Sequence, residues 1–151
     1  MIDKIKKLRE QTGVSVMACR KALADAGGDP AEAVKILQKE GIKIADKKSE
    51  RKTKAGVIDA YIHSNKKIGA LVEIKCETDF VARNKDLQNF VHDIAMHIAA
   101  MAPDAAADGQ NFFSQPFIKN PGVTIEDYLK ETIQKFGENI EISRFERYEI
   151  L

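Results

Sequence analysis

Residues 56–84 read GVIDAYIHSNKKIGALVEIKCETDFVARN, and their hydrophobic period indicates the fold class. Val57, Ile58, Ala60 and Ile62 precede the polar cluster Ser64–Lys67. After the cluster, apolar residues alternate with other residues at Ile68, Ala70, Val72 and Ile74, and the whole pattern is typical of two strands joined by a turn. In the second strand Val72 and Ile74 should face the core, with the charged residues that alternate with them on the other side. This stretch therefore predicts a β-hairpin.

The first forty residues carry the signals of three short helices. Gly13 and the pair Gly27–Gly28 are natural helix ends, and apolar residues recur at helical spacing between them. In Asp29–Glu32 an N-cap is followed by a proline at the first helical position and by an acid three residues after the cap. We expect this third helix to end at Gly41. The pattern predicts a small helical domain over residues 1–42.

A charged segment follows this unit. Residues 43–54, KIADKKSERKTK, hold six basic and two acidic residues, and residues 1–54 have a net charge of +6 against −5 for residues 55–151. The basic run is either a solvated spacer or a phosphate-binding segment. It lacks the aromatic rings on which single-stranded nucleic acid stacks, so the pattern favours a linker, and no direct nucleic-acid binding is expected.

The rest of the chain alternates between helical and extended patterns. Residues 84–102 show a hydrophobic stripe at a helical period, and a second helix should run from a cap at Thr124 to Gly137. Residues 104–122 predict a long loop pinned by Phe112, Phe113 and Phe117. Residues 140–151 should pair with the hairpin as a third antiparallel strand. We therefore predict an α+β protein, with a three-stranded antiparallel sheet packed with helices in a core domain over residues 55–151.

Composition and motifs argue against several classes of protein. The chain has 151 residues and a formal net charge of +1, with 44% hydrophobic residues, so it is neither disordered nor strongly basic as a whole. Its two cysteines lie far apart with no metal-ligand spacing, which indicates a reducing, cytoplasmic location. There is no 18-residue apolar run, and no Walker, GxGxxG, HExxH or GxSxG motif. We expect no membrane segment, no metal and no cofactor.

The segment between the hairpin and the long helix is a short elbow with an unusual residue at its centre. Thr78 can cap a single helical turn and Asn84 can cap the next helix, so Asp79 and Phe80 are held on a tight connection ahead of Val81. A phenylalanine there is either an internal plug or a projecting wedge. The residues alone leave both interpretations open.

The long helix carries a second unusual feature. Opposite its hydrophobic stripe, Met96 lies among His92, Ala99 and Ala100, a combination that suits a docking surface because thioethers adapt and alanines allow close approach. The alternative is a helix buried on both faces inside one domain. We expect His92 and His97 to lie on the surface or to contact a partner.

Several segments of this chain resemble the translation elongation factor Ts family. The resemblance is carried by residues 12–34, TGVSVMACRKALADAGGDPAEAV, by residues 56–84 quoted above, and by the later segments HDIAMHIAAMAP, QPFIKNP and GENIEISRFERYE. Together they cover nearly the whole chain, and TDFVARN at residues 78–84 is the most specific of them. The resemblance implies a ubiquitin-associated-like N-terminal domain followed by an antiparallel core.

The resemblance also implies a function. Members of this family are guanine nucleotide exchange factors for elongation factor Tu and catalyse no covalent chemistry. The Asp-Phe pair of the elbow, within Thr78–Val81, is then expected to enter the GTPase domain near its magnesium and phosphate site. The N-terminal domain around Val16, Met17 and Cys19 is expected to contact the GTPase domain as well, with the core docked on a β-barrel domain of elongation factor Tu.

One departure from the longer family members bears on the assembly. Those members carry two related copies of the core, whereas the hairpin occurs once here. Short members present an equivalent surface as a homodimer, so a homodimer is expected, and the surface around Met96 contacts either a second copy or elongation factor Tu. Two other classes stay open: a ribosome- or RNA-associated binding module, and an enzyme built on Cys76 with His63 and Asp79.

Overall fold

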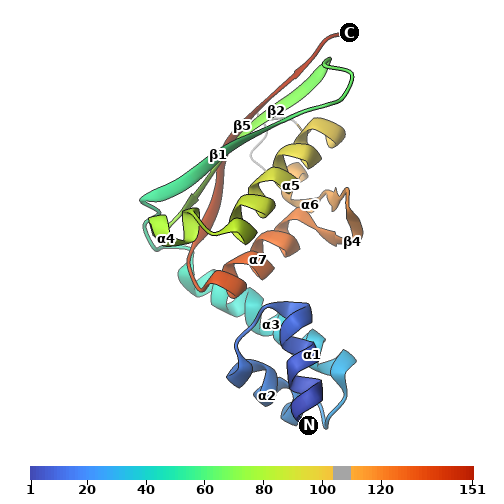
Figure 1. The fold of residues 1–151 in the computed structure, drawn as a ribbon, viewed down its shortest axis with the longest axis vertical. Coiled ribbons are helices and arrows are strands. Elements are labelled where there is room, and N and C mark those ends of the chain that lie inside the picture. Colours follow the sequence, from blue (N-terminus) through green and yellow to red (C-terminus); the bar gives the residue numbers. More distant parts are fainter. Residues whose placement is uncertain (104–109) are drawn as a thin grey trace.

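The N-terminal third of the protein consists of three helices around a small core of its own. The computed structural model describes residues 1–103 and 110–151, and its first helices are α1 (Ile2–Thr12), α2 (Val16–Asp25) and α3 (Pro30–Lys48) (Figure 1). Ser15 caps α2, Asp29 caps α3, and Gly13 ends α1 in the left-handed conformation. The helices enclose Leu8, Cys19, Ala22, Leu23, Ala33 and Leu37. The prediction of three helices is confirmed.

The third helix is longer than expected. The expected end at Gly41 is wrong, because α3 continues to Lys48 and takes in the first half of the charged segment 43–54. Gly41 is a point of close approach, because a Cβ there would lie 2.5 Å from the side-chain oxygen of Gln134 in helix α7 (Ile125–Phe136). Ala45, one turn further on, is buried in the core of the second part of the chain. Helix α3 therefore belongs to both parts.

The second part is built on a three-stranded antiparallel sheet. Strands β1 (Ala55–Ile62), β2 (Ile68–Cys76) and β5 (Ile140–Glu149) lie in the order β1-β2-β5. This confirms the hairpin and the third strand. Val72 and Ile74 are fully buried on the inner face of β2, as their alternation predicts.

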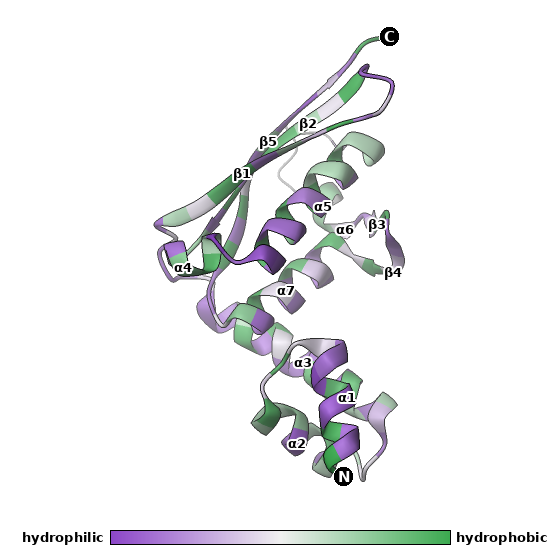
Figure 2. Cartoon of the chain, viewed as in Figure 1, coloured by the Kyte–Doolittle hydropathy of each residue, from purple (hydrophilic) through white to green (hydrophobic). Residues whose placement is uncertain are grey.

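Helices cover the inner face of this sheet. Helix α5 (Lys85–Met101) lies along β1 and β2, and α7 (Ile125–Phe136) packs between α5 and α3 (Figure 1). Figure 2 shows hydrophobic stretches along β2 and a mixture of hydrophobic and hydrophilic residues around α5. The buried side chains of this core include Val72, Ile74, Leu87, Phe90, Ile94, Ile98, Ile125 and Ile133. Helix α7 has the expected capping box of Thr124 with Asp127, and Gly137 ends it.

The segment after α5 is more ordered than the predicted loop. It contains the one-turn helix α6 (Gln110–Ser114) and a small hairpin of β3 (Pro116–Phe117) and β4 (Asn120–Thr124); residues 104–109 of the predicted loop lie outside the described residues. Phe112 and Phe117 are buried and Phe113 packs against the core, so the prediction that these rings pin the segment is confirmed.

The expected position of His97 is wrong. This residue was expected at the surface, but it is fully buried on α5. Its Nε2 lies 2.9 Å from the side-chain oxygen of Gln115, and its Nδ1 accepts a hydrogen bond of 3.3 Å from the backbone N–H of Ile118. The histidine therefore joins α5 to the β3–β4 hairpin.

Candidate functional site

The elbow after β2 forms a single helical turn, α4 (Asp79–Ala82), between two capped ends. The Thr78 side chain accepts a hydrogen bond from the N–H of Val81 at 3.3 Å, and Asn84 caps α5 by accepting from the N–H of Asp86 at 2.8 Å. Both caps were predicted and both are present. The five residues between Thr78 and Asn84 are therefore held at both ends by a cap.

Within this turn, Phe80 points out of the molecule. It is 84% exposed, whereas the next two residues, Val81 and Ala82, are buried in the core. Of the two interpretations of Phe80, the internal plug is therefore excluded for the free protein, and the ring projects. Asp79 is exposed beside it. Val81, one of the expected partner-binding residues, instead anchors the turn to the core.

A carboxylate from a distant part of the sequence holds the base of the elbow. Glu138, in the turn between α7 and β5, accepts hydrogen bonds from the backbone N–H groups of Glu77 and Thr78, each at 3.1 Å, and from the Thr78 hydroxyl at 2.7 Å. In return, the Glu77 carboxylate accepts from the backbone N–H of Asn139 at 2.9 Å. Sequence reasoning missed Glu138 and Asn139, because nothing in their local pattern relates them to a segment 60 residues earlier.

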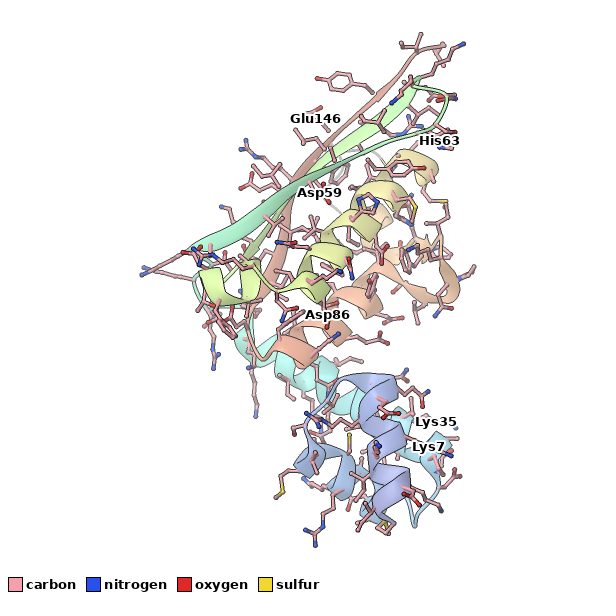
Figure 3. All side chains as sticks on the ribbon, viewed as in Figure 1. Lys7, Lys35, Asp59, His63, Asp86 and Glu146 are labelled. Carbon is pink, nitrogen blue, oxygen red and sulfur yellow. The ribbon has the colours of Figure 1, made fainter. Side chains whose placement is uncertain are left out.

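Cys76 lies beneath the elbow and does not form a nucleophilic site. Burial, followed by the charge of Glu138, raises the pKa of its thiol, which donates a hydrogen bond to the carbonyl of Thr78 at 3.3 Å. His63 follows the other end of β1, since Ala55 pairs with Cys76 and Ile62 with Gly69 (Figure 3). The two ends of β1 are seven residue steps apart, roughly 24 Å. The enzyme hypothesis built on Cys76 and His63 is therefore not supported.

A second exposed apolar group lies at the start of α2. Met17 is 73% exposed and Val16 is about half exposed, directly after the cap Ser15. Cys19, the third residue expected on this surface, is fully buried in the core of the three helices. It supports α2 from within, so only Val16 and Met17 are available to a partner.

The predicted surface around Met96 is only partly open. His92 and Ala100 are exposed, Met96 is half-buried, and Ala99 is buried, with its carbonyl accepting a hydrogen bond from Arg147 of β5 at 3.0 Å. His92 lies 3.4 Å from the carboxylate of Asp59 on β1. Helix α5 is thus covered on most of its circumference, which is close to the alternative interpretation of a helix buried on both faces.

The outer face of the sheet is a further exposed surface, which sequence analysis did not single out. Ile58, Ile62, Leu71 and Tyr148 are each at least half exposed there, on three adjacent strands. Glu146, labelled in Figure 3, pairs in register with Leu71 at its border. The signal was present in the sequence, because the outward positions of β1 include the apolar residues Ile58 and Ile62.

The described residues form neither a metal site nor a membrane-spanning helix. Across residues 1–103 and 110–151, no three His, Cys, Asp or Glu side chains are grouped so that they could share a metal ion. In the same part of the chain, no helix has the length and apolar character to cross a membrane.

Comparison with known proteins assigns the family. A family model described as Elongation factor TS matches residues 29–110 and 77–150, which together span most of the chain. The chain belongs to the elongation factor Ts family. The elongation factor Ts of Rubrobacter xylanophilus is 40% identical to it, over 99% of this chain and 98% of that protein, and the elongation factor Ts of Fervidobacterium nodosum is 39% identical over 97% and 95%.

The relatives also differ in length. The alignment with the elongation factor Ts of Rubrobacter covers 191 residues, more than the 151 of this chain, so that relative contains residues without a counterpart here. The elongation factor Ts of Aquifex aeolicus is 41% identical over 150 residues, which are 98% of this chain but 52% of that protein. The elbow and the elements that hold it lie within the region matched by the elongation factor Ts family model.

Proposed function

We propose that this chain is a guanine nucleotide exchange factor for elongation factor Tu in translation elongation, and that Phe80 is its wedge. Family membership supports the activity and the partner. The mechanism rests on one observation: Phe80 is 84% exposed on a turn whose following residues are buried and whose base is bound by Glu138. Such a ring is presented in a fixed direction before any partner arrives.

Physical chemistry explains why this arrangement suits binding. A phenylalanine side chain gains about 1.5–3 kcal/mol when it leaves water for an apolar site, and the free factor does not realise that gain at Phe80. Because the elbow is already ordered, little conformational entropy is lost when the ring enters a pocket of the partner. Asp79, beside the ring, would lie at the rim of that pocket and pair with polar groups there.

Exchange then follows from thermodynamic linkage. In a GTPase, magnesium and the nucleotide phosphates hold each other in place, so a wedge that displaces the groups around them weakens nucleotide binding without cutting a bond. The nucleotide must in turn weaken the binding of the factor by the same ratio. GDP leaves, and GTP, present in excess, displaces the factor. The factor itself needs no cofactor and is not an enzyme of covalent chemistry.

Two further surfaces complete the proposal. Val16 and Met17 on α2 would contact the GTPase domain, and the exposed residues of α5, His92 and Ala100, would contact elongation factor Tu or a second copy of this chain. The module of residues 1–42, the segment 43–54 and the core of residues 55–151 would act as three functional parts, although α3 runs through the first boundary. We place this activity in the cytoplasm.

We also propose a homodimer formed through the outer face of the sheet. An apolar face on three strands is unfavourable while it is exposed to water. Two copies related by a twofold axis would bury it, because each would cover the other with the same residues. The ion pair of Glu73 with Arg144 flanks the face. These two charges neutralise each other within one protomer and need no partner from the second copy. This face is a better candidate than Met96, which is half-buried.

The alternative of an RNA-associated module receives less support. Its basis is the net charge of +6 on residues 1–54, but part of that charge is used inside the molecule. In the segment 43–54, Lys48 donates a hydrogen bond to the carbonyl of Gly137, and Arg51 lies 3.6 Å from the carboxylate of Glu77. These contacts attach the segment to the base of the elbow.

The decisive experiment measures release of a fluorescent guanine nucleotide from purified elongation factor Tu. Substoichiometric amounts of this chain should accelerate release, because each molecule acts repeatedly. Salt-sensitive binding to RNA without acceleration of release would refute the proposal and favour the RNA-associated module.

A further inference from the structure

We infer that Glu138 is a positioning residue that sets the direction in which Phe80 leaves the molecule. This inference rests on the proposed function, since it concerns how the wedge is held. The hydrogen bonds that Glu138 accepts come from Glu77 and Thr78 and not from Phe80. It acts through Thr78, the residue that caps the turn carrying Phe80.

The contacts of Glu138 converge on the base of the elbow. Both of its carboxylate oxygens are used: Oε1 accepts the two backbone N–H groups of Glu77 and Thr78, and Oε2 accepts the Thr78 hydroxyl. Hydrogen bonds to a carboxylate are stronger than those between neutral groups, and the one from the Thr78 hydroxyl is 2.7 Å long. Three donors on two consecutive residues leave this part of the backbone little freedom to rotate.

The Thr78 hydroxyl transmits this constraint to the turn. A hydroxyl has one proton to donate and lone pairs to accept with. Because the proton is directed at Glu138, a lone pair of the same oxygen is left for the N–H of Val81, 3.3 Å away. Helix α4 has only four residues, far fewer than a helix needs to be stable alone, so its orientation depends on this cap and on the burial of Val81.

Glu138 is itself held by a rigid surround. Its neighbour Asn139 is buried, donates its backbone N–H to Glu77, and donates its side-chain amide to the carbonyl of Arg51 at 2.8 Å. Before it, Gly137 ends α7 in the left-handed conformation and its carbonyl accepts from Lys48 at the end of α3. Hydrogen bonds thus connect the base of the elbow to the ends of both α3 and α7. Such a fixed base suits a segment whose side chain must point in one direction.

Loss of the carboxylate should loosen the elbow without detaching it. In Glu138→Ala the turn would keep the burial of Val81 and Ala82 and the thiol hydrogen bond from Cys76 to the Thr78 carbonyl. Only the three contacts at its base would disappear. We therefore expect a folded protein whose Phe80 ring samples a wider range of directions.

The first measurement tests this in the free protein and does not depend on elongation factor Tu. The chain has no tryptophan, so Phe80→Trp places a single tryptophan on the elbow, which can be excited selectively over the three tyrosines. Time-resolved anisotropy should show an increased amplitude of nanosecond motion when Glu138→Ala is added. The matched control is Glu126→Ala, which removes an exposed carboxylate paired with Lys130 at the other end of α7 and should leave the motion unchanged.

The second measurement tests the consequence for nucleotide release. Glu138→Ala should lower the maximal release rate at saturating factor by about tenfold, with a change of less than about threefold in the concentration that gives half the maximal rate. Added to Phe80→Ala, the same change should have less than about a twofold effect, since residues that act as a unit are not additive. Glu138→Gln keeps an oxygen for the two backbone N–H groups and should restore part of the rate.

The outcomes separate this inference from the proposed function. Unchanged mobility in both Glu138→Ala and Glu138→Gln would overturn the positioning role, while slow release by Phe80→Ala would still support the wedge. Full effects of Glu138→Ala in the Phe80→Ala background would also overturn it, because Glu138 would then act elsewhere. If Phe80→Ala alone leaves release unchanged, the wedge itself is refuted.

Discussion

Replacement of Phe80 by alanine separates a projecting wedge from a structural residue. In the free protein about one sixth of Phe80 is covered, because 84% of it is exposed. A phenylalanine side chain offers on the order of 200 Å² of surface, so the covered part is roughly 30 Å², and at about 25 cal/mol per Å² its removal costs under 1 kcal/mol of folding free energy. A buried phenylalanine would cost about 3–5 kcal/mol.

The same substitution should have a large effect on exchange. A ring that fills a pocket in the partner behaves as a hot spot worth about 2 kcal/mol or more, which corresponds to a release rate about thirtyfold lower. Two assays on one preparation test this: a thermal or urea melt of the free factor, and release of fluorescent GDP from elongation factor Tu. Ile2→Ala, which shortens an apolar side chain of similar exposure (82%) at the start of α1, is the control and should affect neither.

Two results would contradict this reasoning. A loss of several kcal/mol in the melt, with a proportionate loss of activity, would mean that Phe80 supports the fold despite its exposure. A normal melt together with a normal release rate would mean that the ring enters no pocket of the partner. Only a normal melt with slow release agrees with the wedge.

Other predictions concern the assembly, the domain boundary and a buried histidine. Leu71→Asp should convert a dimer into a monomer in analytical ultracentrifugation, and a wild-type protein already monomeric at micromolar concentration would refute the sheet-face interface. Deletion of residues 1–42 should leave a core that binds elongation factor Tu weakly and melts cooperatively at a lower temperature, because contacts of α3 with α7 are lost. Loss of the cooperative melt would show that the two parts fold as one. Burial lowers the pKa of His97 below the ordinary 6.5, so the unfolded chain binds the proton more readily, and the free energy of unfolding should decrease as the pH falls below 6.5. His97→Gln should flatten that dependence, and an unchanged pH profile would contradict the assignment.

The sequence alone was sufficient for the elements that depend on short-range patterns. The alternation in β2, the helical stripe of α5 and the capping box of Thr124 with Asp127 are all encoded within a few residues. A strand or a helix places its side chains with a period set by local backbone geometry, so the pattern of the face that it buries is visible before any tertiary contact is known. The α+β class and the strand-turn-helix setting of the elbow followed from these patterns.

Packing decided the remainder, because it depends on residues that are distant in sequence. Gly41 has the local character of a helix end, yet α3 continues through it because the missing side chain allows Gln134 to approach. His97 has a polar side chain that usually lies near solvent, but Gln115 and Ile118 satisfy both of its nitrogens in the core.

The direction of Phe80 is the functional example of the same rule. Its own segment allowed a plug or a wedge equally, since both begin with Thr78 as a cap. The choice was made by the burial of the residues after it and by Glu138, which is 60 residues further along the chain. A local pattern states which residues can form a turn, but only the contacts that close around the turn determine which of its side chains is left facing the solvent.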